Sequence, residues 1–276
     1  MTQTAFIERM LKKFGWKASA KRRYTPADVK PDEDMCPQTQ EDIQFMLGKP
    51  YKELIGTLLY LVVCTRPDIA FITCALARYS SNPGRLHWRA ATTVLKYLKH
   101  TKDMGLYFKA GTKGDTDANG IVIAPLSLWT DSSYLGGDEG RTTLGECLFS
   151  GDHLIHWRSS LSANVPQSVA EAEIMAANSG AKEWQWATQV VEGVFSQGQP
   201  TILYIDCQPA IDSIVSGKIP RKIRHLKSKY YFVRDLYAEG VLIPEWVDSG
   251  MQRADILTKV RANPVFSELR VQCGLE

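Results

Sequence analysis

The sequence lacks closely spaced cysteine pairs and long apolar runs. Its six cysteines are scattered through 276 residues, which argues against a zinc site or a disulfide framework and favours reduced cysteines in a core. Residues 54–64 form the most apolar run, which is far too short to span a bilayer. Residues 1–16 alternate charged and apolar side chains, unlike a signal peptide. We therefore expect a soluble intracellular protein that is not secreted and has no membrane partner.

The chain also has little excess charge of either sign. Its 33 Lys and Arg residues against 30 Asp and Glu residues give a net charge of +3. This total does not identify a polyanionic partner, so the distribution of the charges matters more. Internal repeats and low-complexity tracts are absent, and 44% of the residues are hydrophobic. A chain of this size and composition is expected to form about two domains with buried cores.

The first predicted domain, residues 1–110, is mainly helical. A short amphipathic helix in residues 6–14 precedes a proline-containing, acidic segment, residues 21–50, which is expected to be a surface linker. Apolar periodicity and helix-end signals then predict three helices, at residues 51–63, 68–80 and 86–100.

The second predicted domain, residues 111–276, mixes strands with helices. Three strands at residues 126–130, 143–149 and 153–157 are expected to form an antiparallel meander. They are followed by a long helix at 169–194, a buried strand at 201–205, a basic helical region at 223–239, a strand at 241–246 and a last helix near Ala254. This order predicts an α/β fold, a mixed five-stranded sheet with flanking helices.

Two aspartates stand where predicted strands end. Asp131 follows the strand 126–130, and Asp206 follows the apolar strand 201–205. The carboxyl ends of sheet strands are where α/β proteins place their functional sites. Each aspartate, taken singly, is explained equally well as an ordinary strand-end or helix-capping residue.

Two further acids are candidates on helices. Glu173 begins the apolar stripe of its predicted helix and is expected to point at the sheet, whereas Glu171, about 200° around the helix, is expected to face solvent. The alternative role for Glu173 is to complement the helix dipole in the first turn. Asp255 stands at the start of the last predicted helix, where a solvated first-turn acid is the ordinary explanation.

Converging carboxylates repel one another unless cations neutralise them. Hard oxygen ligands suit Mg²⁺, and Mn²⁺ is an acceptable substitute. Two such ions about 4 Å apart activate a water and stabilise the leaving oxygen of a phosphodiester. If Asp131, Glu173, Asp206 and Asp255 converge, they predict a two-metal phosphodiesterase site that needs no organic cofactor.

Four segments carry a family resemblance: LWTDSSYLGG, VAEAEIMAA, LYIDCQPAI and MQRADILTK. In order and spacing they resemble the ribonuclease H domain of copia-type retrotransposon Pol polyproteins. Upstream, YKELIGTLLYLVVCTRPDIAF, ARYSSNPGRLHWRAATTVLKYLKHT and GLYF resemble the reverse transcriptase segment just before that domain. The resemblance covers about residues 6–275.

The resemblance implies a thumb or connection segment in residues 1–110 and a ribonuclease H-like domain in residues 111–276. It also implies that the four acids above are the catalytic metal ligands of an endoribonuclease. The implied reaction is hydrolysis of the RNA strand of RNA–DNA hybrids during retrotransposon reverse transcription. Its implied partners are the hybrid and the polymerase part of the same polyprotein, in the cytoplasm, within a virus-like particle, or in the nucleus.

The sequence departs from the family pattern in several places. Residues 168–174 read SVAEAEI, where the family usually has SSTEAEY. Residues 247–253 contain no histidine, unlike cellular ribonucleases H, but the element-encoded family also commonly lacks it. No predicted strand carries the paired aspartates of a polymerase site, so DNA synthesis is not expected. These departures favour a second hypothesis, a catalytically inactive nucleic-acid-binding remnant of such an element. A different nuclease or transposase of the same fold would leave the upstream resemblance unexplained.

Acid-free runs of basic residues predict contacts with nucleic-acid phosphates. A solvated helix face is the alternative explanation of such runs. Ser132 and Gln208 each closely follow a candidate aspartate and are further candidates for contact with the nucleic-acid backbone or a 2′-hydroxyl. The basic candidates are Arg89, Lys96, Arg221, Lys222, Arg224, Lys227 and Lys229.

Overall fold

The computed structural model describes residues 1–15, 22–109, 115–116, 122–123, 125–192, 200–216 and 227–276. The chain divides into two compact units, residues 1–107 with 259–276, and residues 108–258. The C-terminal segment 259–276 therefore packs with the first unit, although a division at residue 110 places it in the second domain. Among the described residues, no helix combines the length and the apolar character needed to cross a bilayer.

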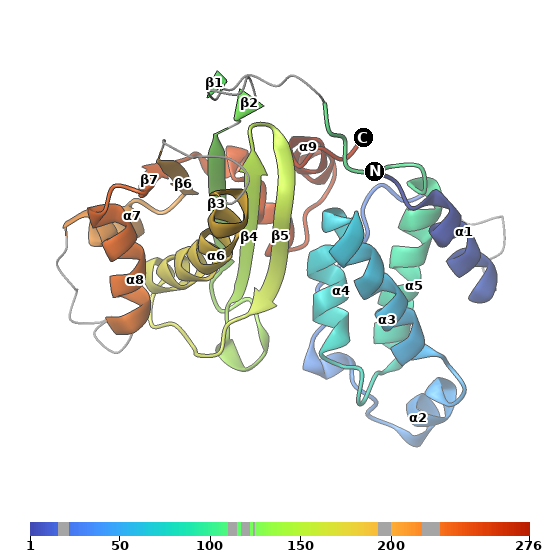
Figure 1. Cartoon of the computed structure of the whole chain (residues 1–276). Helices are drawn as coiled ribbons and strands as arrows, with labels where there is room; N and C mark the ends of the chain where they lie inside the picture. Colours follow the sequence, from blue (N-terminus) through green and yellow to red (C-terminus); the bar gives the residue numbers. More distant parts are fainter. Residues whose placement is uncertain (16–21, 110–114, 117–121, 124, 193–199, 217–226) are drawn as a thin grey trace. The chain divides into compact units, whose positions relative to one another are not determined.

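The first unit is helical. The longest helices, α3 (Tyr51–Cys64) and α5 (Arg85–His100), pack with the short, apolar α4 (Ala70–Ala77), as Figure 1 shows. All three predicted helices are therefore present. Among the described residues of the unit, the other helices are α1 (Thr4–Lys13), α2 (Gln40–Met46) and α9 (Val265–Gln272), with 3-10 turns at Glu33–Met35 and Pro67–Ile69.

The predicted surface linker, residues 21–50, is more ordered than expected. It contains α2, and its Ala27 is buried. The imidazole of His87, fully buried on α5, has its Nε2 atom 3.0 Å from the carbonyl oxygen of Asp32 and accepts a hydrogen bond from the Gly84 amide at Nδ1. The prediction that this segment is a plain surface linker was wrong. The segment contacts α5, and its prolines and acids do not indicate those contacts.

A buried ion pair organises the centre of the first unit. The Arg66 guanidinium donates to both carboxylate oxygens of Asp68, at 2.9 and 2.7 Å, and neither side chain is exposed. The Tyr97 hydroxyl donates to the same carboxylate at 2.6 Å, and Thr101 accepts from Arg66 through its carbonyl and hydroxyl oxygens. Every charge in this network is therefore matched by a polar partner.

The second unit is built on a five-stranded sheet in the order β5-β4-β3-β6-β7. Three strands form the predicted antiparallel meander, while β6 pairs in parallel with both β3 and β7 (Figure 1). The strands are β3 (Leu126–Ser133), β4 (Thr143–Ser150), β5 (His153–Leu161), β6 (Thr201–Ile205) and β7 (Leu242–Trp246). This mixed sheet with flanking helices is the predicted fold class, which is confirmed. A separate two-stranded sheet pairs β1 (Asp115–Thr116) with β2 (Val122–Ile123).

Helix α6 (Val169–Glu192) lies against β3 and β4 and fills the main core of the unit. Its Gly180 is needed for this close approach, because a Cβ there would stand 2.8 Å from Cγ2 of Thr130. Two more helices, α7 (Gln208–Ser216) and α8 (Lys227–Ala238), pack with each other and with β7. Helix α7 was not predicted, and the last predicted helix, near Ala254, is the 3-10 segment Arg253–Leu257.

Candidate metal centre

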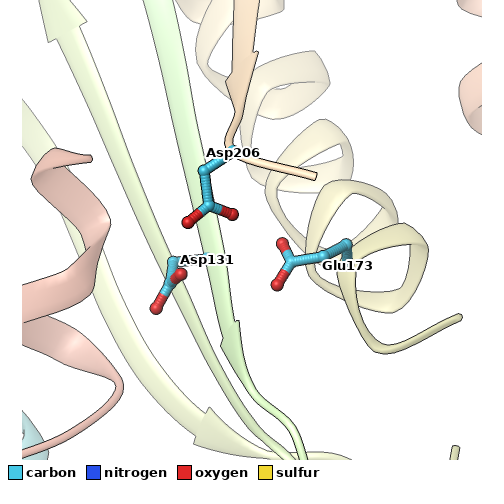
Figure 2. A group of neighbouring side chains, drawn as sticks. All are labelled: Asp131, Glu173 and Asp206. Carbon is cyan, nitrogen blue, oxygen red and sulfur yellow. The ribbon is translucent and has the colours of Figure 1, made fainter. Parts of the chain in front are cut away.

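Three carboxylates from three separate elements converge in the second unit. Asp131 belongs to β3, Glu173 to the second turn of α6, and Asp206 directly follows β6. One oxygen from each lies within 4.8 Å of the other two, and Figure 2 shows the three carboxyl groups grouped together. Asp131 lies inside its strand, opposite Gly145 of β4, and not just beyond the strand end as predicted. The parallel pairing of β3 with β6 brings the two aspartates to the same end of the sheet.

Glu173 has two unlike carboxylate oxygens. The amide and the hydroxyl of Ser132 donate to its Oε1 atom, at 3.1 and 2.6 Å. Its Oε2 atom is buried and has no hydrogen-bond partner. Burial raises the pKa of this carboxyl well above its ordinary value, and the negative charge of Asp131 raises the pKa further. Leaving a buried carboxylate oxygen without a partner is costly, so this position favours a proton or a cation.

The other two carboxylates of the group are also held by hydroxyls. Thr258 donates to Oδ2 of Asp131, and Ser249 donates to Oδ2 of Asp206 at 2.8 Å. With the Ser132–Glu173 bond, each of the three acids has one oxygen fixed by a hydroxyl donor. Outer donors of this kind orient metal ligands. The residues therefore fit a hard divalent cation: oxygen ligands only, held in place, with one buried acceptor left unsatisfied.

Sequence reasoning missed Thr258 and Ser249. Thr258 lies in the motif MQRADILTK, three residues after Asp255, where the carboxylate is the more obvious metal ligand. Ser249 lies in the segment after β7, which has no carboxylate among the predicted ligands. Hydroxyls close to a candidate acid are the signal that would have found both residues.

Asp255 is buried but does not belong to the group of three. It lies in the 3-10 segment Arg253–Leu257, and its carbonyl oxygen accepts from the Thr258 amide at 3.2 Å and lies 3.1 Å from the Thr258 hydroxyl oxygen. That hydroxyl has one proton, which is directed to the carboxylate of Asp131, so Thr258 links the backbone at Asp255 to the carboxylate group.

Glu171 does not face solvent, and its predicted orientation was wrong. Its side chain is buried, and its Oε2 atom accepts from the Gln167 amide at 2.8 Å, while its own amide donates to the Ser168 hydroxyl at 3.2 Å. This reciprocal pairing closely resembles a capping box at the start of α6. Residues 171–178 of α6 are all buried, whichever face of the helix they occupy, so helix phase alone does not decide which residues are exposed.

The residues predicted to contact nucleic acid differ in their exposure and in their hydrogen-bond partners. The Ser132 hydroxyl is occupied by Glu173, and the exposed Gln208 donates to Asp212 at 2.8 Å. In the first unit, Arg89 is exposed and Lys96 is half-buried on α5. Lys227 and Lys229 lie on α8, where their side chains are not described, and Arg221, Lys222 and Arg224 lie outside the described residues.

No family model matches the chain. A retrovirus-related Pol polyprotein from transposon TNT 1-94 of Nicotiana tabacum is 32% identical over 278 residues, 100% of this chain and 20% of the relative. The corresponding polyprotein from transposon RE2 of Arabidopsis thaliana is 29% identical over 82% of this chain and 15% of the relative. The chain thus spans a fifth or less of these relatives. Among solved structures, the RNase H1 named LC11, isolated from compost, matches 53% of this chain and 98% of its own, at 15% identity and a TM-score of 0.40.

Proposed function

The homologues of this chain are retrovirus-related Pol polyproteins of copia-type transposons, and from this premise we propose that its second unit is a metal-dependent ribonuclease H. The family predicted from the sequence motifs is thereby confirmed. The proposed reaction is hydrolysis of the RNA strand of an RNA–DNA hybrid. The proposed role of the first unit is that of the thumb or connection segment of the reverse transcriptase.

The observation that carries the proposal is the group formed by Asp131, Glu173 and Asp206, with the unsatisfied Oε2 atom of Glu173 in it. These residues would hold Mg²⁺, with Mn²⁺ as a substitute, and Asp255 is proposed to contribute to a second ion site. When bound, a pair of such ions activates water and stabilises the leaving oxygen of a phosphodiester.

Orienting the metal ligands and binding the substrate are the proposed tasks of the chain's own side chains. The hydroxyls of Ser132, Thr258 and Ser249 hold the carboxylates in fixed orientations, so little reorganisation accompanies metal binding. Basic side chains are proposed to hold the phosphates of the hybrid. In the sequence of the second unit these are Arg221, Lys222, Arg224, Lys227 and Lys229, and in the first unit Arg89 and Lys96. The polymerase part of the polyprotein is a further proposed partner.

The test is cleavage of a labelled RNA–DNA hybrid by the purified chain in Mg²⁺, followed on a denaturing gel. We expect cuts in the RNA strand that leave 5′-phosphate and 3′-hydroxyl ends, with double-stranded DNA and free RNA intact. Asp206→Asn should abolish cleavage but retain hybrid binding, because it removes a ligand charge without changing the shape of the side chain.

Glu239→Gln is the matched control, because it also removes one carboxylate charge, from an exposed position in the same unit. It should cleave at the parental rate. A parental chain that binds the hybrid but leaves its RNA whole in both Mg²⁺ and Mn²⁺ would reject the enzyme and support the inactive binding remnant.

A further inference from the structure

The first unit contains a basic cavity that the nuclease proposal does not use. It has a volume of about 520 Å³ and lies between residues 22–30 and residues 260–263. This volume falls within the range of about 300–1,000 Å³ that is usual for small-molecule sites. Four cationic side chains and one carboxylate line it: Arg22, Arg23, Lys30, Arg261 and Asp28.

The surroundings of Arg23 show that the basic cavity offers too few hydrogen-bond acceptors for its cationic side chains. Its guanidinium forms an ion pair with Asp28, which is 64% exposed, while the Arg23 side chain is 26% exposed. The Nε atom of Arg23 is buried and has no hydrogen-bond partner. A guanidinium carries five N–H donors, and leaving a buried donor unpaired is costly. The cavity therefore favours a ligand that is anionic and rich in acceptor oxygens.

A second cavity adjoins the first and has a different character. Its volume is about 550 Å³, and it shares Tyr24 and Asn263 with the basic cavity. Pro264 and Val271 give it apolar surface. The Tyr24 side chain, 56% exposed, stands where the two cavities meet, and the Arg22 guanidinium lies 5.2 Å from the centre of its ring. An exposed aromatic ring thus lies beside a cluster of positive charge.

We propose that these two cavities bind one nucleotide unit of single-stranded nucleic acid. Its phosphate would lie among the arginines of the basic cavity, because guanidinium groups bind phosphate oxygens with paired donors. Its base would stack on Tyr24, over the less polar cavity. Grooves that bind single strands combine phosphate-tracking cations with aromatic platforms in this way. A duplex stacks its bases on each other and offers no free base face, so an unpaired nucleotide is the fitting ligand.

The test measures binding of a fluorescein-labelled octamer of dT to the full chain by anisotropy. EDTA is present, so that the acidic group of the second unit holds no cation and repels the strand. Tyr24→Leu should weaken binding at least about fivefold, the lower end of a stacking loss, and Tyr24→Phe should keep it. Arg22→Gln and Arg261→Gln should each weaken binding and lower the slope of log affinity against log salt by about 0.7.

Asp28→Asn gives the sharpest outcome, because it should tighten binding. It removes the one carboxylate that lines the basic cavity and releases the Arg23 guanidinium for phosphate, while Glu268 of the second cavity is unchanged. A merely structural role of this ion pair predicts no gain in affinity. Lys52→Gln is the control, an exposed lysine of α3 that lines neither cavity, and it should bind as the parental chain does. Thermal unfolding checks that each variant is folded.

Competition identifies the source of the nucleotide. Unlabelled octamer should displace the probe at lower concentration than dTMP, and dTMP at lower concentration than inorganic phosphate, while blunt duplex DNA competes weakly. Equal competition by dTMP and inorganic phosphate would overturn the stacking on Tyr24. Parental affinity in both Tyr24→Leu and Arg261→Gln would overturn the site itself. Neither outcome depends on nuclease activity. The nucleotide-binding site can therefore be rejected without rejecting the proposed ribonuclease H function, and the reverse.

Discussion

The hydroxyl of Ser132 donates a 2.6 Å hydrogen bond to Oε1 of Glu173, while Oε2 of the same carboxylate is buried without a partner. Since the Ser132 amide donates to Oε1 as well, at 3.1 Å, one oxygen is fixed twice and the other is left for a ligand. Adjacent residues of β3, Asp131 and Ser132, thereby supply one member of the acidic group and the orienting donor of another.

Ser132→Ala should weaken Mg²⁺ binding about 10- to 100-fold, the usual cost of removing an outer donor from a metal ligand. Ser132→Thr keeps the hydroxyl and should restore most of the affinity. Isothermal titration of the metal-free chain with Mg²⁺ and Mn²⁺ measures both variants. Parental affinity in Ser132→Ala would show that the hydrogen bond does not orient Glu173 for metal.

The acidic group also predicts how the stability of the metal-free chain depends on pH. Burial and the charge of Asp131 raise the pKa of Glu173, so the native state binds a proton more tightly than the unfolded chain, whose glutamates titrate near pH 4.3. The associated stability is fully present below that value and is lost as the pH rises through the raised pKa of the native state. Denaturant unfolding in EDTA should therefore show the free energy of unfolding falling with pH.

Two comparisons isolate the contribution of Glu173. Glu173→Gln should flatten the pH dependence, because the amide does not titrate. Mg²⁺ should restore the stability of the parental chain at high pH, since a cation replaces the proton. A parental pH dependence that persists unchanged in Glu173→Gln would assign it to other groups.

Glu171→Gln tests whether the buried Glu171 caps the start of α6 and does not bind metal. Because Glu171 accepts from the Gln167 amide, weakening this bond should cost about 0.5–2 kcal/mol of stability, the range seen for helix caps. Metal affinity should stay parental, in contrast to Glu173→Gln. Unfolding curves and Mg²⁺ titrations of the two variants, which differ by two positions on one helix, separate capping from metal binding. Loss of metal affinity in Glu171→Gln would contradict this division.

The sequence predicted the sheet well because its signals are local. Three strand-like segments in succession predicted the meander, and an apolar run predicted β6 with the bounds that the structure has. Helix α7 was missed because Gln208–Ser216 is short and begins two residues after Asp206, without a clear stop signal between strand and helix.

The candidate site was partly predictable for the same reason. Strand-end position and helix phase singled out Asp131, Asp206 and Glu173, which the structure brings together. The burial of Glu171 was not predictable, because it depends on tertiary enclosure of the helix start. The hydroxyls of Thr258 and Ser249 reach their carboxylates from 127 and 43 residues away, a distance that no local pattern reports.

The first unit should depend on its buried ion pair. Burial alone would raise the pKa of Asp68, but the Arg66 charge and the hydrogen bonds from Arg66 and Tyr97 hold it below its ordinary value. Asp68→Asn leaves the guanidinium without its counter-charge and should cost about 3–5 kcal/mol. The double variant Arg66→Met with Asp68→Leu should cost less than Arg66→Met alone or Asp68→Leu alone. Thermal unfolding of these three variants and the parental chain measures this, and additive losses would contradict the coupling.

Asp255 gives the last prediction, because the structure separates it from the group of three. Asp131, Glu173 and Asp206 are close enough to share one ion, whereas a second ion needs another ligand. With a non-cleavable hybrid bound, Asp206→Asn should weaken the first Mg²⁺ site, and Asp255→Asn should leave that site intact but weaken the second. Titration calorimetry should therefore give about two ions for the parental chain and about one for Asp255→Asn at the same metal concentration.

Thr258→Ala controls for a structural effect at this position. Asp255 contacts Thr258 through its backbone, and Thr258 orients Asp131, so a disturbed 3-10 segment would weaken the first site as well. Thr258→Ala should reproduce that pattern, with lower affinity at the first site, while Asp255→Asn should not. If Asp255→Asn matches Thr258→Ala, the aspartate supports the segment and ligates no metal; if its stoichiometry stays at two, the second ion is held by other groups.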